Sequence, residues 1–482
     1  MAISGMVQFV DKLKSTKFAD IFNKWALSPY LIAFWTGFAL ICHVFSLEFI
    51  FYVLVCIYSI LVIFFANDFA SMMPLFVLCY LVPSKKNNPG ITETSVFYGA
   101  TGNAILIMAM LVAVLALLRI IFDKNMGIKK LFLQKRSLIS GMLALGLAYM
   151  FSGIGRPEYW SIFGNNIACG LIQFASIFVL YFIFTATTEW KKIPKGYFAW
   201  IGIAMGLLVS AEVLNVYIIN NVVRDGSIER WFIITGWGHY NNIGAILSMS
   251  IPFAFYMCCK SKHNYIFLSI AVLFMIFLLL SCSRGSIVCG ILIFGISFLI
   301  TFFRADNKKV FRIATLVYAL IGIILLIVLK DWILTLFKNV PNIINQETNN
   351  FNDSERFEVY KKGLQAFVNL PIFGQSFFPY GYAPYEFSVI HSLNRFFPPR
   401  WHNTIVQILS ACGIVGMVAY VLHRYQTIKL FVKEPSIEKT FIGLSILVLL
   451  LMSLLDCHFF NMGPTLIYSM ALAFAEKIHS ED

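Results

Sequence analysis

The sequence predicts an all-α protein, a polytopic transmembrane helix bundle of about 12–14 spans with one large extracytoplasmic loop domain. Of its 482 residues, 59% are hydrophobic and only 13% are charged, and the mean hydropathy is +0.78. Apolar runs long enough to cross a hydrocarbon core of about 30 Å recur along the chain. A chain with so little polar surface requires lipid as its solvent.

The chain divides into five segments. The first, residues 1–27, carries Lys12, Lys14, Lys17 and Lys24 before the first apolar run and is expected to stay in the cytoplasm. Its apolar residues recur at helical spacing, so it could lie flat on the bilayer surface or act as a tether. The other segments are transmembrane helices at 28–329, the large extracytoplasmic loop domain at 330–402, transmembrane helices at 403–476 and a cytoplasmic tail at 477–482.

Apolar runs predict the positions of the helices. They lie near 28–45, 48–64, 68–83, 99–121, 137–153, 165–187, 197–219, 241–258, 264–282, 286–303, 311–329, 403–422, 440–456 and 462–476. Basic connections occur at alternate positions in the count of spans, on the same side as both termini, and this side is expected to face the cytoplasm. These connections are Asp123–Arg136, Thr188–Lys195, Lys260–His263, Phe303–Arg312 and His423–Lys439. The opposite face then carries Gly153–Trp160, Asn220–Tyr240, Ser281–Ser286 and the long connection Lys330–Trp401.

Several classes of function are disfavoured. The ten cysteines lie in or beside apolar runs without metal-like spacing, which predicts small core residues. The net charge of +13 reflects a lysine bias that sets membrane topology, so nucleic acid is not an expected partner. The chain contains no Gly-x-x-x-x-Gly-Lys phosphate loop. Chemistry on the outer face would therefore need an energised lipid-linked substrate or an ion gradient.

The arginines depart from the lysine pattern. On this topology seven of twelve arginines lie outside, against six of twenty-five lysines. Outward arginines could hold a phosphate or diphosphate, because guanidinium binds such oxygens bidentately. They could equally pair with acidic residues in solvated loops. The seven are Arg156, Arg224, Arg230, Arg284, Arg356, Arg395 and Arg400.

Two residues stand at the membrane boundary. Arg284 lies in a short turn between two apolar runs, where a charge needs a partner or a polar cavity, so it is a functional candidate. Snorkelling to lipid headgroups is the alternative. His402 lies where the largest outer loop enters an apolar helix that Asn403 or Thr404 could cap. Histidine suits general-base chemistry near neutral pH, although an interfacial histidine is often structural.

Other histidines and an asparagine pair offer further candidates on the outer face. These are His239, followed by Tyr240-Asn241-Asn242, and also His391 and His458.

An ordered set of motifs resembles the bacterial O-antigen ligase and O-antigen polymerase superfamily. The stretch His402-Asn403-x-x-x-Gln407-x-x-x-x-x-Gly413-x-x-Gly416 resembles its signature. Before it come Asp353-Ser354-Glu355-Arg356 and the turn Pro371-Ile372-Phe373-Gly374, in the family's order. Ser283-Arg284-Gly285-Ser286 and Tyr240-Asn241-Asn242-Ile243-Gly244 resemble two further motifs. The resemblance covers roughly Trp231 to Tyr420.

The resemblance implies a GT-C-like membrane glycosyltransferase of the bacterial plasma membrane, acting at the outer face without a metal or other cofactor. A glycan would pass from an undecaprenyl-diphosphate carrier to a hydroxyl of a glycan or lipid acceptor. His402 would be the general base, Arg284, Arg356 and Arg400 would bind the diphosphate, and Asn403, His239 and Asn242 would position donor or acceptor. Membrane lipids and other polysaccharide-assembly proteins are the remaining implied partners.

Two other functions are compatible with the sequence. A lipid-linked oligosaccharide flippase would also need arginines for a diphosphate, although it usually has broken helices near the midplane and internal symmetry. A structural subunit of an envelope-polysaccharide machine would need no chemistry at all. The motifs do not separate a polymerase from a ligase, nor do they identify the sugar.

Overall fold

The fold is almost entirely helical. The computed structural model describes residues 12–83, 99–123, 136–220, 222–224, 227–328, 330, 353–378 and 401–478. Within these residues the strands are one short antiparallel pair, β1 (Val223–Arg224) and β2 (Ser227–Ile228). The predicted all-α class is therefore confirmed.

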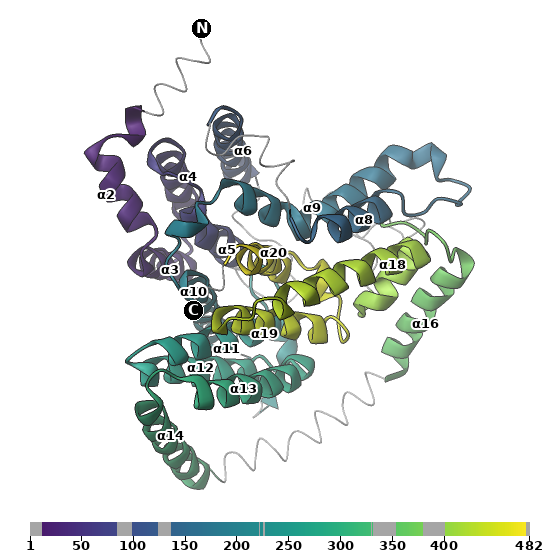
Figure 1. Cartoon of the computed structure of the whole chain (residues 1–482). Helices are drawn as coiled ribbons and strands as arrows, with labels where there is room; N and C mark the ends of the chain where they lie inside the picture. The colour runs from purple at the N-terminus through teal and green to yellow at the C-terminus, as the bar shows by residue number, and fades with distance from the viewer. Residues whose placement is uncertain are drawn as a thin grey trace.

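Each predicted apolar run contains a helix of the described residues, and the described helices Lys17–Ala26 and Asp353–Asn369 lie outside the predicted runs (Figure 1). The α-helices are α2 (Lys17–Ala26), α3 (Pro29–Val44), α4 (Glu48–Phe65), α5 (Met73–Leu81), α6 (Gly99–Phe122), α8 (Ile139–Met150), α9 (Phe163–Thr187), α10 (Tyr197–Ile219), α11 (Tyr240–Lys260), α12 (Asn264–Leu280), α13 (Arg284–Arg304), α14 (Lys308–Val328), α16 (Asp353–Asn369), α18 (Thr404–Val432), α19 (Ile437–Met452) and α20 (Met462–Lys477). Short 3₁₀ turns are η1 (Ala70–Met72), η3 (Trp160–Ile162), η4 (Trp190–Lys192), η5 (Arg230–Phe232) and η6 (His458–Phe460).

The prediction of a multi-span helix bundle is confirmed in part. Among the described residues, seven helices are long and apolar enough to cross a membrane, or up to eight if the bent pair α2 and α3 is one span. Five further helices at predicted apolar runs are shorter than the about 20 residues of a straight crossing. These are α5, α8, α12, α19 and α20, with 9, 12, 17, 16 and 16 residues. Most of the predicted loop domain at 330–402 lies outside the described residues.

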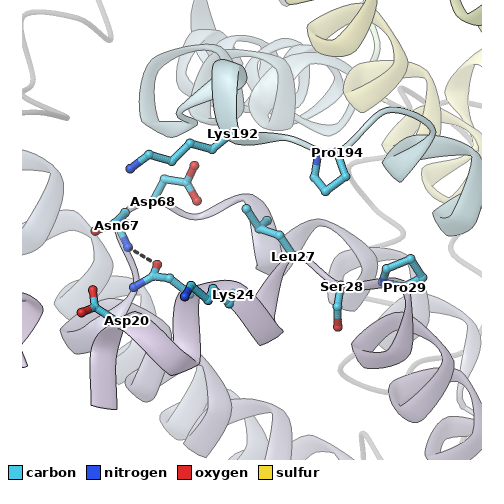
Figure 2. A pocket seen from close by; sticks show the side chains of 10 residues that line it. Asp20, Lys24, Leu27, Ser28, Pro29, Asn67, Asp68, Lys192 and Pro194 are labelled. Atoms are coloured by element: carbon cyan, nitrogen blue, oxygen red, sulfur yellow. Dashed lines mark hydrogen bonds between the residues drawn. The ribbon is translucent and has the colours of Figure 1, made fainter. Parts of the chain in front are cut away.

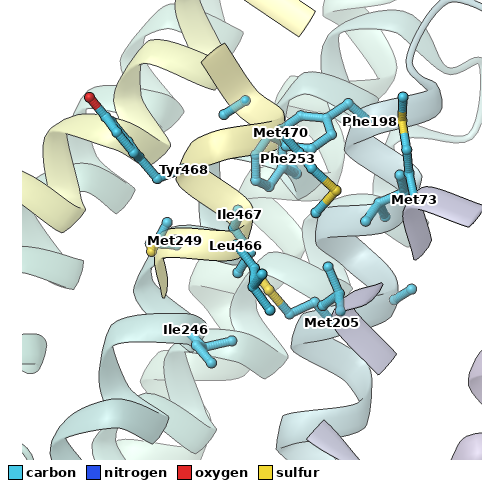
Figure 3. Close-up of a cluster of buried hydrophobic side chains, with 14 of the residues drawn as sticks. Met73, Phe198, Met205, Ile246, Met249, Phe253, Leu466, Ile467, Tyr468 and Met470 are labelled. Carbon is cyan, nitrogen blue, oxygen red and sulfur yellow. The ribbon is translucent and has the colours of Figure 1, made fainter. Parts of the chain in front are cut away.

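Helix α11 forms the centre of the bundle. It packs against α10, α12, α13 and α19, and 94% of its apolar window is buried inside the protein. A helix that is buried on every side needs partners for its polar side chains, and Asn242, Ser248 and Ser250 of α11 all make hydrogen bonds inside the protein. Figure 3 shows Ile246, Met249 and Phe253 of α11 packed among side chains of α5, α10 and α20. This core fixes the helices that carry the site.

Hydrogen bonds join connections that are distant in the sequence. Backbone N–H groups of Asn67, Glu189 and Gly196 donate to side chains of Asn23, Asp68 and Glu438 respectively. Elsewhere, the Gly153 N–H donates to the Phe373 carbonyl.

Helix α18 is broken where the chain following α16 packs against it. Gly413 has a left-handed backbone, with φ +62°. The N–H groups of Ile414 and Val415 donate to the carbonyls of Pro371 and Ile372, at 2.8 and 3.2 Å. In the other direction, the N–H groups of Gln375 and Ser376 donate to Ser410 and Ala411. These bonds satisfy backbone groups that the break leaves without helical partners.

The predicted connection His423–Lys439 is shorter than expected, because α18 continues to Val432. His423 and Arg424 therefore lie within the bundle. The Tyr468 hydroxyl accepts from Arg424 Nη1 at 2.7 Å and lies 2.8 Å from His423 Nε2. The guanidinium also lies 4.2 Å from the ring centroid of Phe459. The Tyr468 hydroxyl and the aromatic faces stabilise the Arg424 cation inside the protein. The charge of the segment had instead predicted a connection outside the bundle.

We expect Gly413→Ala and Gly374→Ala to destabilise the protein by more than about 1 kcal/mol. Both glycines have positive φ, and an added Cβ would lie 2.4 Å from the carbonyl oxygen of Ile372 or from the carbonyl carbon of Ala411. The thermal unfolding midpoint in detergent measures the loss. Gly295→Ala is the matched control, because it lies in α13 with nothing within 4 Å of the added Cβ. Equal midpoints for all three variants would contradict the role of the break.

Candidate functional site

His402 lies at the start of α18 in a strained conformation. Its φ is +50°, a left-handed value that is uncommon outside glycine. The Tyr360 hydroxyl of α16 donates to the His402 carbonyl at 3.2 Å. Asn403 caps α18 by accepting from the N–H groups of Ile405 and Val406, and its Nδ2 donates to the Leu454 carbonyl at 2.9 Å. The His402 backbone is therefore held from three directions.

The imidazole of His402 is paired with a carboxylate from a distant part of the sequence. His402 Nδ1 lies 3.1 Å from Asp456 Oδ1, in the turn after α19. The His402 side chain is 44% exposed, whereas that of Asp456 is 8% exposed. One ring nitrogen thus has a buried acceptor, while the ring itself remains reachable.

The Asp456 carboxylate stays ionised. Burial opposes its charge, but the hydrogen bond from His402, the nearby positive charges of His458 and His402, and the Cys457 N–H at 2.7 Å together lower its pKa below the ordinary value. A carboxylate only accepts hydrogen bonds, so His402 Nδ1 is the donor in this contact. In the neutral ring with this tautomer, Nε2 is the nitrogen that can accept a proton, as a general base requires.

A chain of side-chain hydrogen bonds joins this pair to the turn before α13. Asp456 Oδ2 accepts from Asn241 Nδ2 at 3.2 Å, and Asn241 Oδ1 accepts from the Ser283 hydroxyl at 2.9 Å. Ser283 immediately precedes Arg284, the first residue of α13. The structure therefore brings three of the motif segments, at 241, 283–284 and 402, to one end of the bundle.

The α11–α13 contact that supports this chain is very close. A Cβ on Gly244 would lie 2.5 Å from Ser286 and 3.0 Å from Ser283. The Ser283 and Ser286 hydroxyl oxygens are 2.7 Å apart, and Ser248 donates to the Ser286 carbonyl. Small residues in both helices are what allow Asn241 to reach Ser283.

The remaining predicted site residues occupy varied positions. Arg284 is exposed. Arg356 lies on α16 one turn before Tyr360, and its side chain is outside the described ones. His239 caps α11 by accepting from the Asn241 N–H at 3.3 Å. The side chain of Asn242 is nearly buried and accepts from Asn461 Nδ2 at 2.8 Å. Arg395, Arg400 and His391 lie outside the described residues.

An aromatic and cationic cluster lies beside the asparagine motif. The Arg230 guanidinium is 5.0 Å from the ring centroid of Trp231 and 5.2 Å from that of Tyr240. The rings of Trp231 and His239 lie 5.7 and 5.2 Å from that of Tyr240. Trp231 is 49% exposed. A half-exposed indole thus lies against the buried ring of Tyr240, next to Asn241.

Sequence reasoning missed Asp456. It closes an apolar run and is the single acidic residue between Lys439 and Glu476. An ionisable residue at the end of a membrane helix is a functional candidate, so this signal was present. Asn241 was named within a motif, but its hydrogen bonds to Asp456 and Ser283 depend on tertiary contacts that no local pattern encodes.

Among the described residues, no group of three or more His, Cys, Asp or Glu side chains is arranged so that it could hold a metal ion. The ten cysteines are free thiols that are buried or half-buried, as their positions in apolar runs predicted.

Comparison with known protein families finds a match to part of the chain. Residues 269–421 match the model of a family described as O-Antigen ligase. The match confirms the resemblance to the O-antigen ligase and polymerase superfamily and indicates a membrane enzyme of that type. It begins within α12, ends within α18, and includes Arg284, Arg356 and His402. Among curated proteins, no match to the chain is found.

The ionised Asp456 gives a prediction for stability against pH. Because its pKa is lowered in the folded protein, its contribution is complete at neutral pH and is lost as the pH falls below the unfolded value of about 4. Asp456→Asn should therefore lower the thermal unfolding midpoint at pH 7, and the deficit relative to wild type should shrink below about pH 4.

The matched control is Asp306→Asn, whose carboxylate is 59% exposed and 3.8 Å from Lys260. Surface pairs of this kind contribute little, so its midpoint should stay near wild type. A deficit for Asp456→Asn that is independent of pH would contradict the assignment of an ionised carboxylate.

Proposed function

We propose that this protein transfers or polymerises a glycan from an undecaprenyl-diphosphate-linked donor onto an acceptor hydroxyl, at the outer face of the bacterial plasma membrane. The observation that carries the proposal is the His402–Asp456 pair, at 3.1 Å, in a site that also contains the Ser283-Arg284 turn. The family match over residues 269–421 supports the reaction class. The product would be an O-antigen, capsular or other surface polysaccharide.

His402 would act as the general base. Its Nε2 takes the proton of the acceptor hydroxyl as the acceptor oxygen forms a bond to the anomeric carbon of the donor sugar. The bond from that carbon to the diphosphate oxygen breaks, and the bonding electrons leave with the diphosphate. Asp456 holds the ring and stabilises the imidazolium that forms, so it is a positioning residue.

The leaving diphosphate needs cations aimed at its developing charge. Arg284 stands next to Ser283, which the hydrogen-bond chain through Asn241 connects to Asp456. Arg356 and Arg400 are proposed to complete the diphosphate site. Arginine's planar fork makes bidentate contacts with phosphate oxygens that a lysine ammonium cannot reproduce.

Asn403, His239 and Asn242 would act on substrates through the segments that they hold. Asn403 fixes the start of α18 beside His402, and His239 fixes the start of α11 beside Asn241. Asn242 is engaged with Asn461. In this proposal they position the site and the loops that receive donor and acceptor.

We expect His402→Ala and Asp456→Asn to lower glycan transfer by about 10²–10⁴-fold, because base catalysis and ring orientation are lost. The assay uses purified protein in nanodiscs with a short undecaprenyl-diphosphate-linked glycan, alone or with candidate acceptors, and separates products by size. His263→Ala is the matched control, since His263 lies at the start of α12 in a predicted cytoplasmic connection.

The same assay distinguishes the two reactions. A ladder of carrier-linked glycans indicates a polymerase, whereas one product that needs an added acceptor indicates a ligase. Unchanged transfer by His402→Ala would remove the mechanism. Tight donor binding without any product, together with accumulation of flipped lipid, would favour the flippase.

The surface formed by Arg230, Trp231 and Tyr240 is proposed to bind a sugar ring of donor or acceptor. Exposed aromatic faces suit the apolar face of a sugar, and the guanidinium offers hydrogen-bond donors at its edge. Trp231→Ala should raise KM about three- to tenfold with little change in kcat, because binding rather than chemistry is affected. Trp231→Phe should keep most of the affinity. A loss confined to kcat in both variants would contradict this subsite.

A further inference from the structure

We propose that a cavity beneath α2 binds the headgroup of a phospholipid that carries a primary ammonium, of the phosphatidylethanolamine class. The cavity has a volume of about 650 Å³. It lies between α2, the turn into α3, the connection after α4 and the connection between η4 and α10 (Figure 2). It is at the end of the bundle opposite to His402 and is independent of the glycan chemistry.

The cavity lies at the depth of lipid headgroups. Helices α2 and α3 meet at a bend of 71° and are together long and apolar enough to form one membrane span. If α3 crosses the bilayer, α2 runs close to its surface. Leu27, Ser28 and Pro29, at the bend, line the cavity. A ligand there would meet polar groups on the aqueous side and α3 on the lipid side.

The outer face of α2 continues as an apolar surface suited to acyl chains. Phe22 and Ala26 are buried, whereas Ile21 and Trp25 are 60% and 43% exposed. Tyr30, at the start of α3, is 80% exposed. Tryptophan and tyrosine are enriched at membrane interfaces, where an apolar ring and a polar group are both accommodated.

The walls of the cavity are held at a fixed separation. Asn23 Oδ1 accepts from the Asn67 N–H at 2.8 Å, the bond drawn in Figure 2, and Asn23 Nδ2 donates to the Phe65 carbonyl at 3.1 Å. Opposite, the Asp68 carboxylate accepts from the N–H groups of Ala70 and Glu189. The hollow is thus part of the folded structure.

The charges in the cavity favour a zwitterion. Asp68 is engaged by backbone N–H groups, and Lys192 is paired with Glu189 at 2.5 Å. The side chains of Asp20 and Lys24, one turn apart on α2, make no hydrogen bond or ion pair within the described residues. Lys24 can bind a lipid phosphate, and Asp20 can accept from an adjacent ammonium.

Other headgroups fit this pair less well. Phosphatidylglycerol offers Asp20 only neutral hydroxyl donors, which bind a carboxylate more weakly than an ammonium does and leave the lipid's negative charge without an adjacent cation of its own. Phosphatidylcholine has a quaternary ammonium, which has no N–H to donate to a carboxylate. A primary ammonium beside a phosphate satisfies both free side chains.

Native mass spectrometry of the delipidated full chain, titrated with equimolar dioleoyl phosphatidylethanolamine, phosphatidylglycerol and phosphatidylcholine, tests the proposal. Wild type should retain the ethanolamine lipid preferentially. Lys24→Gln should lower its occupancy about three- to tenfold. Asp20→Asn should shift preference toward phosphatidylglycerol, because a repelling carboxylate is removed. Lys17→Gln, on the same helix but not lining the cavity, is the matched control and should behave as wild type.

A second arm separates a lipid from a soluble phosphoamine. Glycerophosphoethanolamine should compete far more weakly than the lipid, since it lacks the acyl chains that the exposed face of α2 would contact. Equal competition would overturn the assignment to a lipid. Equal retention of the three lipids, or the same occupancy loss in Lys17→Gln and Lys24→Gln, would overturn the site itself.

Discussion

The geometry of the site depends on the hydrogen bonds that one buried carboxylate accepts. Asp456 accepts them from the His402 ring, the Asn241 side-chain amide and the Cys457 backbone N–H. An ionised group away from water is tolerated only when such donors are fixed around it. The three donors come from widely separated parts of the sequence. Satisfying one carboxylate therefore brings the start of α11, the start of α18 and the turn after α19 together.

The break in α18 provides the second constraint. Backbone bonds in both directions join Ser410–Val415 to Pro371–Ser376, so the segment after α16 is fixed to the helix that begins beside His402. Two left-handed glycines, Gly374 and Gly413, permit this approach. Through Tyr360, α16 also reaches the His402 carbonyl. The turn at Pro371–Gly374 and the glycine at 413, which are separate features in the sequence, form one contact that holds α16 beside the start of α18.

The sequence was informative wherever a local pattern determines structure. Each predicted apolar run contains a helix of the described residues, and the start of α18 was predicted at Asn403 or Thr404, because capping is a local interaction. Asn403 is the cap. Hydropathy could not distinguish a full crossing from the 12-residue α8 or the 9-residue α5. Hydropathy also placed the end of α18 ten residues too early, at 422 instead of Val432. The polar residues His423 and Arg424 continue the helix because Tyr468 of α20, which is distant in the sequence, contacts both.

The candidate site was predicted in part for the same reason. His402 and Arg284 could be named because their positions at membrane boundaries are visible in the sequence. The partner of His402 could not be assigned, because the distance between Asp456 and His402 is decided by the packing of α18 and α19. The Asn241 bridge likewise requires the close contact at Gly244.

The location of Asp456 limits how this protein could be recombined with its relatives. The segment that matches the family runs from residue 269 to residue 421, so it contains His402 but neither Asn241 nor Asp456. A chimera that exchanged only that segment would unite a histidine from one parent with a hydrogen-bond acceptor from the other. The hydrogen-bonded group would stay intact only if three non-contiguous pieces were exchanged together.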